Sequence, residues 1–210
     1  MSIASDELRD LLPTWAVAAL LPLPAATFWQ DGSGRSFAYI YLFLGCALVV
    51  AERFSRPGAA VAGPHLWRSK MAALAVAAAG AVGVFTAFGW SMGGRAGFEV
   101  PLLAALAVLP ALGCVPFLTI RTGKPYAAVL FALLLMGAIK VVGCLVVRAV
   151  YGTDALAQGY MTLPWEEPNL LVWLCLAGAI VASVALHLLG RRAFLATGRG
   201  AVAVTVPSAS

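Results

Sequence analysis

The sequence predicts an all-α fold, a polytopic helical bundle that crosses a membrane six times and keeps both termini in the cytoplasm. Three observations lead to this prediction. Hydrophobic residues make up 62% of the 210 residues and charged residues only 11%, whereas soluble domains carry about 25% charged residues. The mean hydropathy is +0.93. Six apolar segments follow one another along the chain, and the basic residues gather at their ends.

The six apolar segments differ in length. They run from Pro13 to Trp29, Phe37 to Ala51, Met71 to Trp90, Val100 to Ile120, Tyr126 to Tyr151 and Leu170 to Leu189. The last four reach the length of about 20 residues that a helix needs to cross ~30 Å of hydrocarbon. The first two are shorter, so we expect them to recruit flanking residues such as Gly34 and Glu52, to tilt little, or to form a shallow hairpin.

The distribution of basic residues sets the predicted orientation. If the N-terminus is cytoplasmic, Arg35 and Arg95 are the only cations of the outer loops, against ten on the inner side. The inner ten are Arg9, Arg53, Arg56, Arg68, Lys70, Arg121, Lys124, Arg191, Arg192 and Arg199. Such a bias places those segments in the cytoplasm. Aromatic residues near the segment ends fit two interfacial belts, with Trp15, Trp67 and Tyr126 on the inner side.

The segments outside the membrane complete the predicted organisation. In residues 1–12, leucines share one face and charges the others, which indicates an amphipathic helix on the inner membrane surface. The alternative is a plain N-terminal extension of the first apolar segment. The six-helix domain then covers residues 13–190, with an inner loop at 52–70 and an outer loop at 152–169. The apolar residues of that outer loop predict short re-entrant helices. Residues 191–210 form a cytoplasmic tail.

Small residues predict close helix packing. The third segment places Ala75, Ala79, Gly83 and Ala87 four residues apart, and the sixth does the same with Cys175, Ala179, Ser183 and His187. Such stripes let two backbones approach. We expect contacts within the chain first, and a dimer face only second. Pro22, Pro24, Pro110 and Pro116 interrupt two of the segments. All four cysteines fall in apolar runs without CxxC spacing, which is typical of packing residues.

Several kinds of chemistry have no support in the sequence. The Gly123-Lys124 pair precedes Pro125 and lacks the upstream glycine of a nucleotide-binding loop, so we do not expect this chain to hydrolyse ATP itself. The sequence contains no HExxH, GxSxG or paired intramembrane carboxylates, and a haem between His65 and His187 is disfavoured. The formal charge of +5 is spread over segment ends, so nucleic acid is not an expected partner. We therefore predict neither an enzyme nor a cofactor or metal site.

Lys140 is the residue that most invites a functional interpretation. It lies near the middle of the apolar run from Ala127 to Val150, where a cation costs roughly 2.5–3.5 kcal/mol on translocon-based scales. Such a residue normally faces a protein interior or a water-filled cavity. Alternatively, it pairs with a carbonyl or carboxylate in a packed bundle, or belongs to a subunit contact. Gly137 and Cys144 share its helix face and would leave room around the ammonium group.

The organisation resembles the membrane subunits of ABC exporters, specifically the type-2 permease class. The resemblance rests on the DELRDLLPTW segment before the first span, six spans with both ends inside, and an inner loop that reaches PHLWRSK at the third span. Members often carry an acidic residue after the second span, and later a proline and an aliphatic-tryptophan pair before a lysine. Matching residues here are Glu52, Pro64, Leu66, Trp67 and Lys70. The Gly-Thr element of the family is missing, and the loop is shortened.

This resemblance implies a permease subunit in the inner membrane of a bacterium, in contact with membrane lipids. It would pair with itself or with a sister subunit and bind a separate cytoplasmic ATPase through Glu52, Pro64, Leu66, Trp67, Arg68 and Lys70. Gly137, Lys140 and Cys144 would line the translocation path.

Two other classes of function remain open. One is a scaffold or anchor subunit of a respiratory or photosynthetic complex, which would need no ATPase. The weaker one is a lipid-modifying enzyme, for which the sequence offers no catalytic residues.

Overall fold

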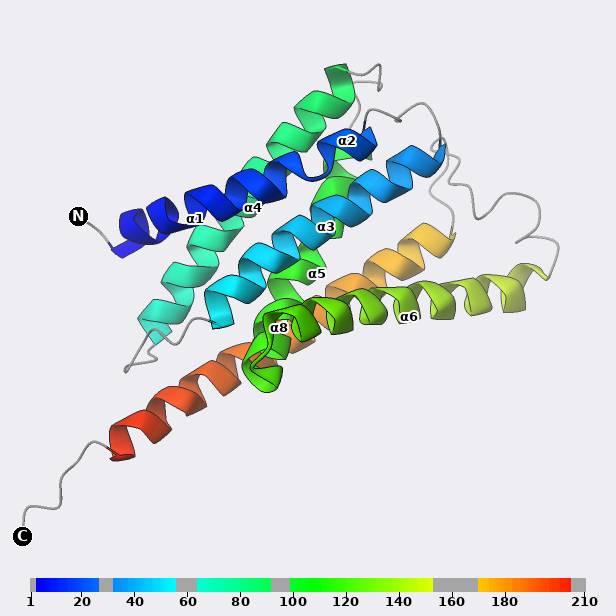
Figure 1. The fold of residues 1–210 in the computed structure, drawn as a ribbon. Coiled ribbons are helices and arrows are strands. Elements are labelled where there is room, and N and C mark those ends of the chain that lie inside the picture. The colour runs from blue at the N-terminus through cyan, green and yellow to red at the C-terminus, as the bar shows by residue number, and fades with distance from the viewer. Residues whose placement is uncertain (1–2, 27–31, 56–63, 92–98, 153–169, 205–210) are drawn as a thin grey trace, which may run out of the picture.

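The computed structural model describes residues 3–26, 32–55, 64–91, 99–152 and 170–204, and these ranges are helical throughout apart from short links (Figure 1). The helices are α1 (Ile3–Leu20), α2 (Leu23–Ala26), α3 (Gly32–Ser55), α4 (Pro64–Ser91), α5 (Glu99–Thr122), α6 (Pro125–Tyr151) and α8 (Leu170–Val204). The all-α membrane bundle predicted from the sequence is therefore confirmed, and the re-entrant loop predicted at 152–169 lies almost entirely outside the described residues.

Four helices are long and apolar enough to cross a membrane. The qualifying stretches are Ala38–Ser55, Pro64–Ser91, Pro125–Tyr151 and Trp173–Ala196, and two shorter apolar stretches are Leu11–Leu20 and Ala107–Thr122. The second predicted segment gains length as expected, because α3 includes both Gly34 and Glu52. The fourth predicted segment lies within α5, which runs for 24 residues from Glu99 to Thr122.

Helix boundaries follow local chemistry at two places. α1 ends at Leu20 and α2 begins at Leu23, so the break falls at Pro22, where a proline removes a backbone donor. The link between α5 and α6 is Gly123 and Lys124: Gly123 has φ +66° and donates its N–H to the Thr119 carbonyl at 2.9 Å. Only glycine adopts that conformation without strain, and Pro125 then starts the next helix with its fixed φ.

The bounds of the predicted segments outside the membrane also change. α1 runs without a break from Ile3 through Pro13 to Leu20, so the N-terminal segment and the first part of the first apolar segment form one helix. Residues 52–55 of the predicted inner loop belong to α3 and residues 64–70 to α4. α8 continues to Val204, so much of the predicted tail is helical.

α5 is the central element of the bundle. It packs against α3, α4, α6 and α8, while α1 packs against α3 and α4 on one side (Figure 1). The core consists of residues from α1, α3, α4, α5 and the start of α6, with Leu42, Phe85 and Val115 among its fully buried side chains. α6 and α8 lie along the opposite edge, and only 17% of each apolar stretch is buried.

α5 and α8 approach each other closely at a glycine of α5. A Cβ atom placed on Gly113 would lie 2.5 Å from the Ser183 Cβ and 2.6 Å from its Cα. Ser183 belongs to the predicted small-residue stripe of α8 and is buried, as is Ala179. That stripe therefore makes a contact within the chain, as expected.

The small-residue stripe of α4 behaves differently. Ala75, Ala79, Gly83 and Ala87 are all exposed, and nothing lies within 4 Å of a Cβ placed on Gly83. The interpretation of this stripe as a contact within the chain is wrong. α4 instead buries Ala78, Ala81 and Phe85, which lie on its other face. Sequence spacing alone does not tell which of these two faces of α4 turns inward. The face that carries the larger apolar side chain, Phe85, is the one that is buried.

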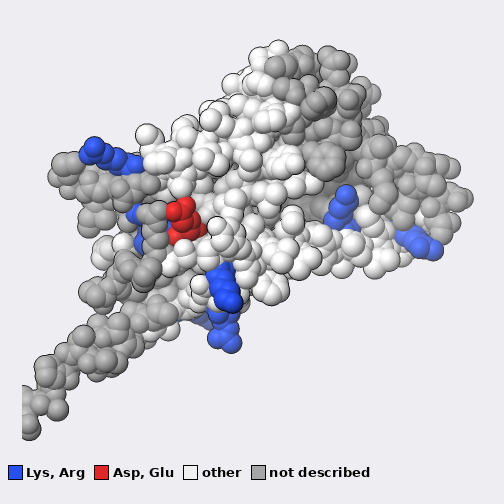
Figure 2. Space-filling view, in the orientation of Figure 1, with Lys and Arg blue, Asp and Glu red and all other residues white. Residues whose placement is uncertain are grey.

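Basic residues gather at one end of the bundle. The N-terminus of α1, the C-terminus of α3, the N-terminus of α4 and the C-terminus of α8 lie toward the same end (Figure 1). On the face drawn in Figure 2, Lys and Arg lie mainly toward that end, and others stand apart over the far half of α6. The cytoplasmic location of this end stays a prediction.

We predict that Gly113→Ala destabilises the bundle. The added methyl group would overlap the α8 backbone at Ser183, and overpacking of this kind costs about 1–3 kcal/mol. The measurement is the thermal unfolding midpoint of the purified chain in mild detergent, which we expect to fall by several degrees.

Gly137→Ala is the matched control, because nothing lies within 4 Å of a Cβ at that position. It should leave the midpoint unchanged or raise it slightly, since alanine is the better helix former. Equal midpoints for the two variants would contradict the close contact between α5 and α8.

Candidate functional site

A cluster of aromatic rings joins three helices at the basic end of the bundle. The Trp67 ring lies 5.2 Å from Phe54, 5.4 Å from His187 and 5.4 Å from Phe194, measured between centroids. Phe54 and Phe194 meet edge to face at 6.1 Å. Tilted and edge-to-face pairs at these distances are favourable beyond the apolar area that they bury. We call these four rings, with Lys70, the junction cluster.

Lys70 ties the start of α4 to the end of α3. Its Nζ donates a hydrogen bond to the Arg53 carbonyl at 3.3 Å and lies 5.5 Å from the centre of the Phe54 ring. Arg53 is in the last turn of α3, whose final carbonyls have no partner within the helix. A cation at this position satisfies one carbonyl and interacts favourably with the helix dipole. Only 6% of Lys70 is exposed, so both interactions are shielded from solvent.

The structure divides the predicted ATPase-coupling residues into two groups. Trp67 and Lys70 are buried inside the chain. Pro64 and Arg68 are exposed on the first turns of α4, and Leu66 and Glu52 are half-buried. The buried pair therefore fixes the position of the surface that the exposed pair forms. Trp67 is consequently a packing residue of the bundle rather than a residue of an aromatic belt in contact with lipid.

Sequence reasoning missed three members of the junction cluster. Phe54 follows directly on Arg53 near the end of α3, while His187 and Phe194 lie seven residues apart on α8. A separation of seven residues is two helical turns and places both rings on one face. That spacing was a usable signal. The contact of His187 and Phe194 with Trp67 could not be predicted from this spacing, because Trp67 lies more than a hundred residues earlier in the sequence.

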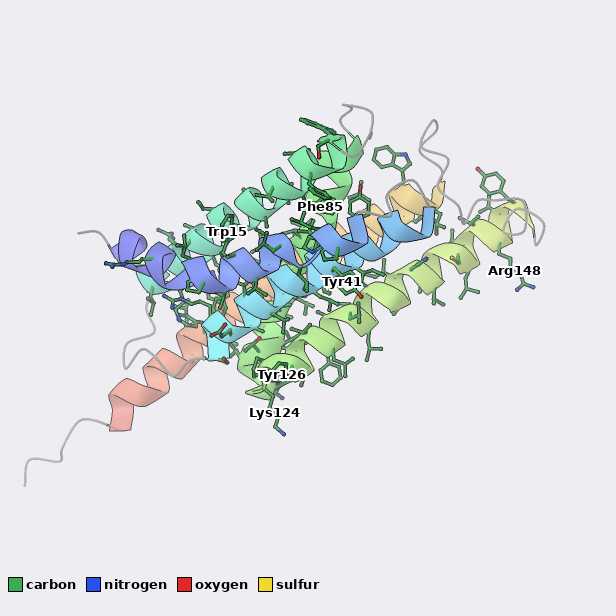
Figure 3. All side chains as sticks on the ribbon, turned by 45° about the horizontal axis from the view of Figure 1, so that its top comes forward. Trp15, Tyr41, Phe85, Lys124, Tyr126 and Arg148 are labelled. Carbon is green, nitrogen blue, oxygen red and sulfur yellow. The ribbon has the colours of Figure 1, made fainter. Side chains whose placement is uncertain are left out.

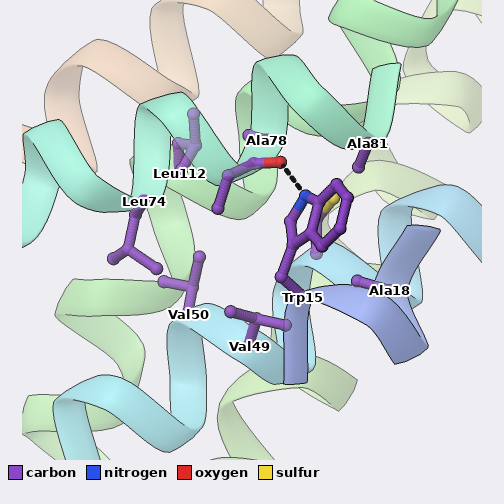
Figure 4. A pocket seen from close by; sticks show the side chains of 10 residues that line it. Trp15, Ala18, Val49, Val50, Leu74, Ala78, Ala81 and Leu112 are labelled. Carbon is purple, nitrogen blue, oxygen red and sulfur yellow. Dashed lines mark hydrogen bonds between the residues drawn. The ribbon is translucent and has the colours of Figure 1, made fainter. Parts of the chain in front are cut away.

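A second tryptophan holds α1 against α4. The Trp15 indole Nε1–H donates to the Ala77 carbonyl at 2.7 Å (Figure 4). The ring lines a narrow crevice that has room for little more than one water molecule, and the walls of the crevice are almost entirely apolar. Ala18, Val49, Val50, Leu74 and Leu112 are among the lining residues. Its small polar surface makes the crevice a packing feature of the bundle and a poor binding site for a polar ligand.

Gly137 and Lys140 lie on the exposed surface of α6, whereas Cys144 is half-buried, and both Lys140 and Cys144 interact electrostatically with Cys175 of α8. A Cβ on Gly137 would meet nothing within 4 Å. Figure 3 shows α6 along the edge of the bundle, with Lys124 and Tyr126 at one end and Arg148 toward the other. Lys140 therefore lies outside the core that the described residues form, and its place in a translocation path stays a prediction. α6 turns Ala128, Ala132, Gly143 and Val147 inward instead.

The chemistry available in the described part of the chain is that of packing and contact. No group of three or more His, Cys, Asp or Glu residues there is arranged to hold a metal ion. Cys46, Cys114, Cys144 and Cys175 are free thiols, and the first two are buried, as expected for packing residues. Two features stand out in the described residues. One is the exposed start of α4, which the junction cluster holds in place, and the other is the exposed Lys140 near the middle of α6.

Comparison of the chain with protein families, with curated proteins and with solved structures finds no match.

We predict that Lys70→Met loosens the junction cluster. Methionine keeps most of the buried stem and loses both the bond to the Arg53 carbonyl and the contact with the Phe54 ring. Loss of a buried charge-assisted hydrogen bond costs about 1.5–3 kcal/mol. Thermal unfolding in detergent should show this loss as a lower midpoint.

Arg68→Met is the control, because Arg68 is an exposed cation two residues away on the same helix. Surface substitutions of this kind change stability by about 0.5 kcal/mol or less. The assigned role of Lys70 fails if both variants unfold at the same temperature.

Proposed function

We propose that this chain is the permease subunit of an ATP-driven exporter of the ABC type, located in the inner membrane of a bacterium. A separate cytoplasmic ATPase would bind at the basic end of the bundle. The translocation path would form between this chain and a partner subunit, either a second copy or a sister permease.

The observation that carries the proposal is that the first turns of α4 expose several residues while other residues of the same turns pack against α3 and α8. Pro64, His65 and Arg68 are exposed at the beginning of α4, while Trp67 and Lys70 fasten the same turns to α3 and α8. A contact between a soluble partner and these exposed residues would push on the bundle itself rather than on a loop. Such a mechanical connection is what coupling to ATP hydrolysis needs.

The outward direction of Lys140 is compatible with this proposal if the path lies between subunits. Lys140, Gly137 and Cys144 are on a helix at the edge of the bundle, where a partner would complete the path. A path enclosed by a single chain has little support among the described residues, because most of their buried side chains are apolar and the buried polar ones are Lys70, Thr86, Thr119 and Ser183.

The second candidate function is a scaffold or anchor subunit of a larger membrane complex, such as a respiratory or photosynthetic assembly. The same apolar core and the largely exposed α6 and α8 suit a subunit whose role is to hold other subunits. The two candidates differ in one requirement, because only the exporter needs an ATPase at the start of α4.

We predict that ATP hydrolysis co-purifies with the tagged full-length chain from its native membrane and depends on the exposed start of α4. The variant His65→Ala/Arg68→Glu changes two exposed residues and no member of the junction cluster. Charge reversal at an interface disfavours binding through like-charge contact, so the co-purified ATPase activity should fall about tenfold. Activity per mole of tagged chain is the measurement.

Arg192→Glu provides the control, since Arg192 is an exposed cation of α8 near the same end of the bundle. It should leave the co-purified activity within twofold of the unmodified chain. Absence of ATPase activity from every preparation, together with stoichiometric pigment- or haem-bearing subunits, would favour the scaffold instead.

A further inference from the structure

Lys140 is a cation in the middle of an apolar, outward-facing helix. It is exposed, as are its neighbours Gly137 and Val141 on the same side of α6. Exposed large side chains extend this surface in both directions, from Leu130 to Leu145, and we call it the α6 face. At about 100° per residue, the exposed large apolar side chains of this stretch that lie within about 140° of Lys140 on one side of the helix are Leu130, Leu133, Leu134, Val141 and Leu145. Among the described residues, none makes a hydrogen bond or ion pair with Lys140.

Lipid alone does not satisfy this lysine. Lys140 lies eleven residues before Tyr151 and fifteen after Pro125, which are about 16 Å and 22 Å along the helix axis. A lysine side chain extends about 6 Å from the helix, so its ammonium group falls short of either interface of a bilayer with a ~30 Å core. Charged residues at such depth pair with another group or line a cavity.

A second copy of this chain offers no suitable partner. The nine acidic residues are Asp6, Glu7, Asp10, Asp31, Glu52, Glu99, Asp154, Glu166 and Glu167, and none falls within α6 or in the middle of another candidate span. In a two-fold symmetric dimer built on the α6 face, the two Lys140 residues would lie at the same depth. Like charges would then face each other in a medium of low dielectric constant, which opposes this dimer.

We propose that the α6 face is the docking site for a transmembrane helix of a different protein that carries an Asp or Glu residue near its midpoint. The carboxyl group would pair with the Lys140 ammonium group, and apolar side chains would cover the rest of the face. This inference narrows the partner of the proposed function to a sister subunit with an intramembrane acid. It does not depend on an ATPase, since a scaffold subunit would use the same contact.

The test uses the full-length chain in phosphatidylcholine vesicles and a synthetic partner helix. The probe is a Leu/Ala-rich peptide of about 23 residues, long enough to span the bilayer, with a single central Glu. A matched peptide carries Gln at the same position. Energy transfer between the labelled peptide and the labelled chain gives the association constant of each peptide.

We expect the Glu peptide to associate about tenfold more tightly than the Gln peptide, because only the carboxyl group carries a charge that complements the ammonium group. This preference should disappear in Lys140→Met and persist in Lys140→Arg, which keeps the charge. Arg148→Met, which removes the other exposed cation of the far half of α6, should keep it as well. Since Lys140 is exposed, Lys140→Met should insert and fold like the unmodified chain.

Three results would overturn the inference. One is equal association of the Glu and Gln peptides with the unmodified chain. Another is a preference for the Glu peptide that survives in Lys140→Met. The third is a preference that emerges only after Asp154, Glu166 and Glu167 are neutralised together, since Lys140 would then already be paired within its own chain. None of these readouts involves ATP hydrolysis, so failure here is distinct from failure of the exporter proposal.

Discussion

Transfer of a polar group from water into hydrocarbon, without a hydrogen-bond partner, costs about 4–8 kcal/mol of free energy. A single side-chain contact contributes less than that. This penalty therefore governs how the bundle places its polar groups. It requires the helical backbone, because a helix satisfies its own amide groups. The two lysines within candidate spans differ in this respect. The Lys70 ammonium group donates a hydrogen bond to the Arg53 carbonyl and lies over the Phe54 ring. Lys140 is exposed at mid-helix. The described part of the chain provides a hydrogen-bond partner for Lys70 and none for Lys140.

The way the helices pack also depends on lipid as the surrounding solvent. Lipid tails are as apolar as leucine, so helices associate through close contact rather than through exclusion from water. Gly113 allows the α5 backbone to approach α8 at Ser183, and Gly45 allows α3 to approach α1 at Ala18, where an added Cβ would lie 2.8 Å from the Ala18 Cα. The Trp15 indole adds a hydrogen bond between α1 and α4. Small residues therefore set where the helices touch, and the large ones fill the space between those contacts.

The fold was largely predictable because it depends on properties that are local in sequence. Apolar length located the helices, and Pro22 and Gly123 marked two of their breaks. Which face of a helix turns inward depends on neighbours far away in sequence, and the expectation for α4 was wrong for this reason. The α4 stripe around Gly83 is exposed, while the larger Phe85 on the other face lies in the core. The exposure of Lys140 also follows from long-range packing, because α6 lies at the edge of the bundle. The junction cluster was half predictable: Trp67 and Lys70 belong to one continuous motif, whereas His187 and Phe194 come from the other end of the chain.

The two candidate binding surfaces are the start of α4 and the α6 face, and they differ in how many of their residues pack against the rest of the bundle. The start of α4 is fastened by the junction cluster to α3 and α8, and α5 packs against all three of these helices. A densely packed core transmits a displacement instead of absorbing it, so a partner that moves the start of α4 would move α5 as well. α6 contacts α5 and its neighbours mainly through a narrow stripe that includes Ala128, Ala132, Gly143 and Val147. Little of α6 is buried against the described part of the chain, and the same helix carries Lys140, for which the described residues provide no ion pair.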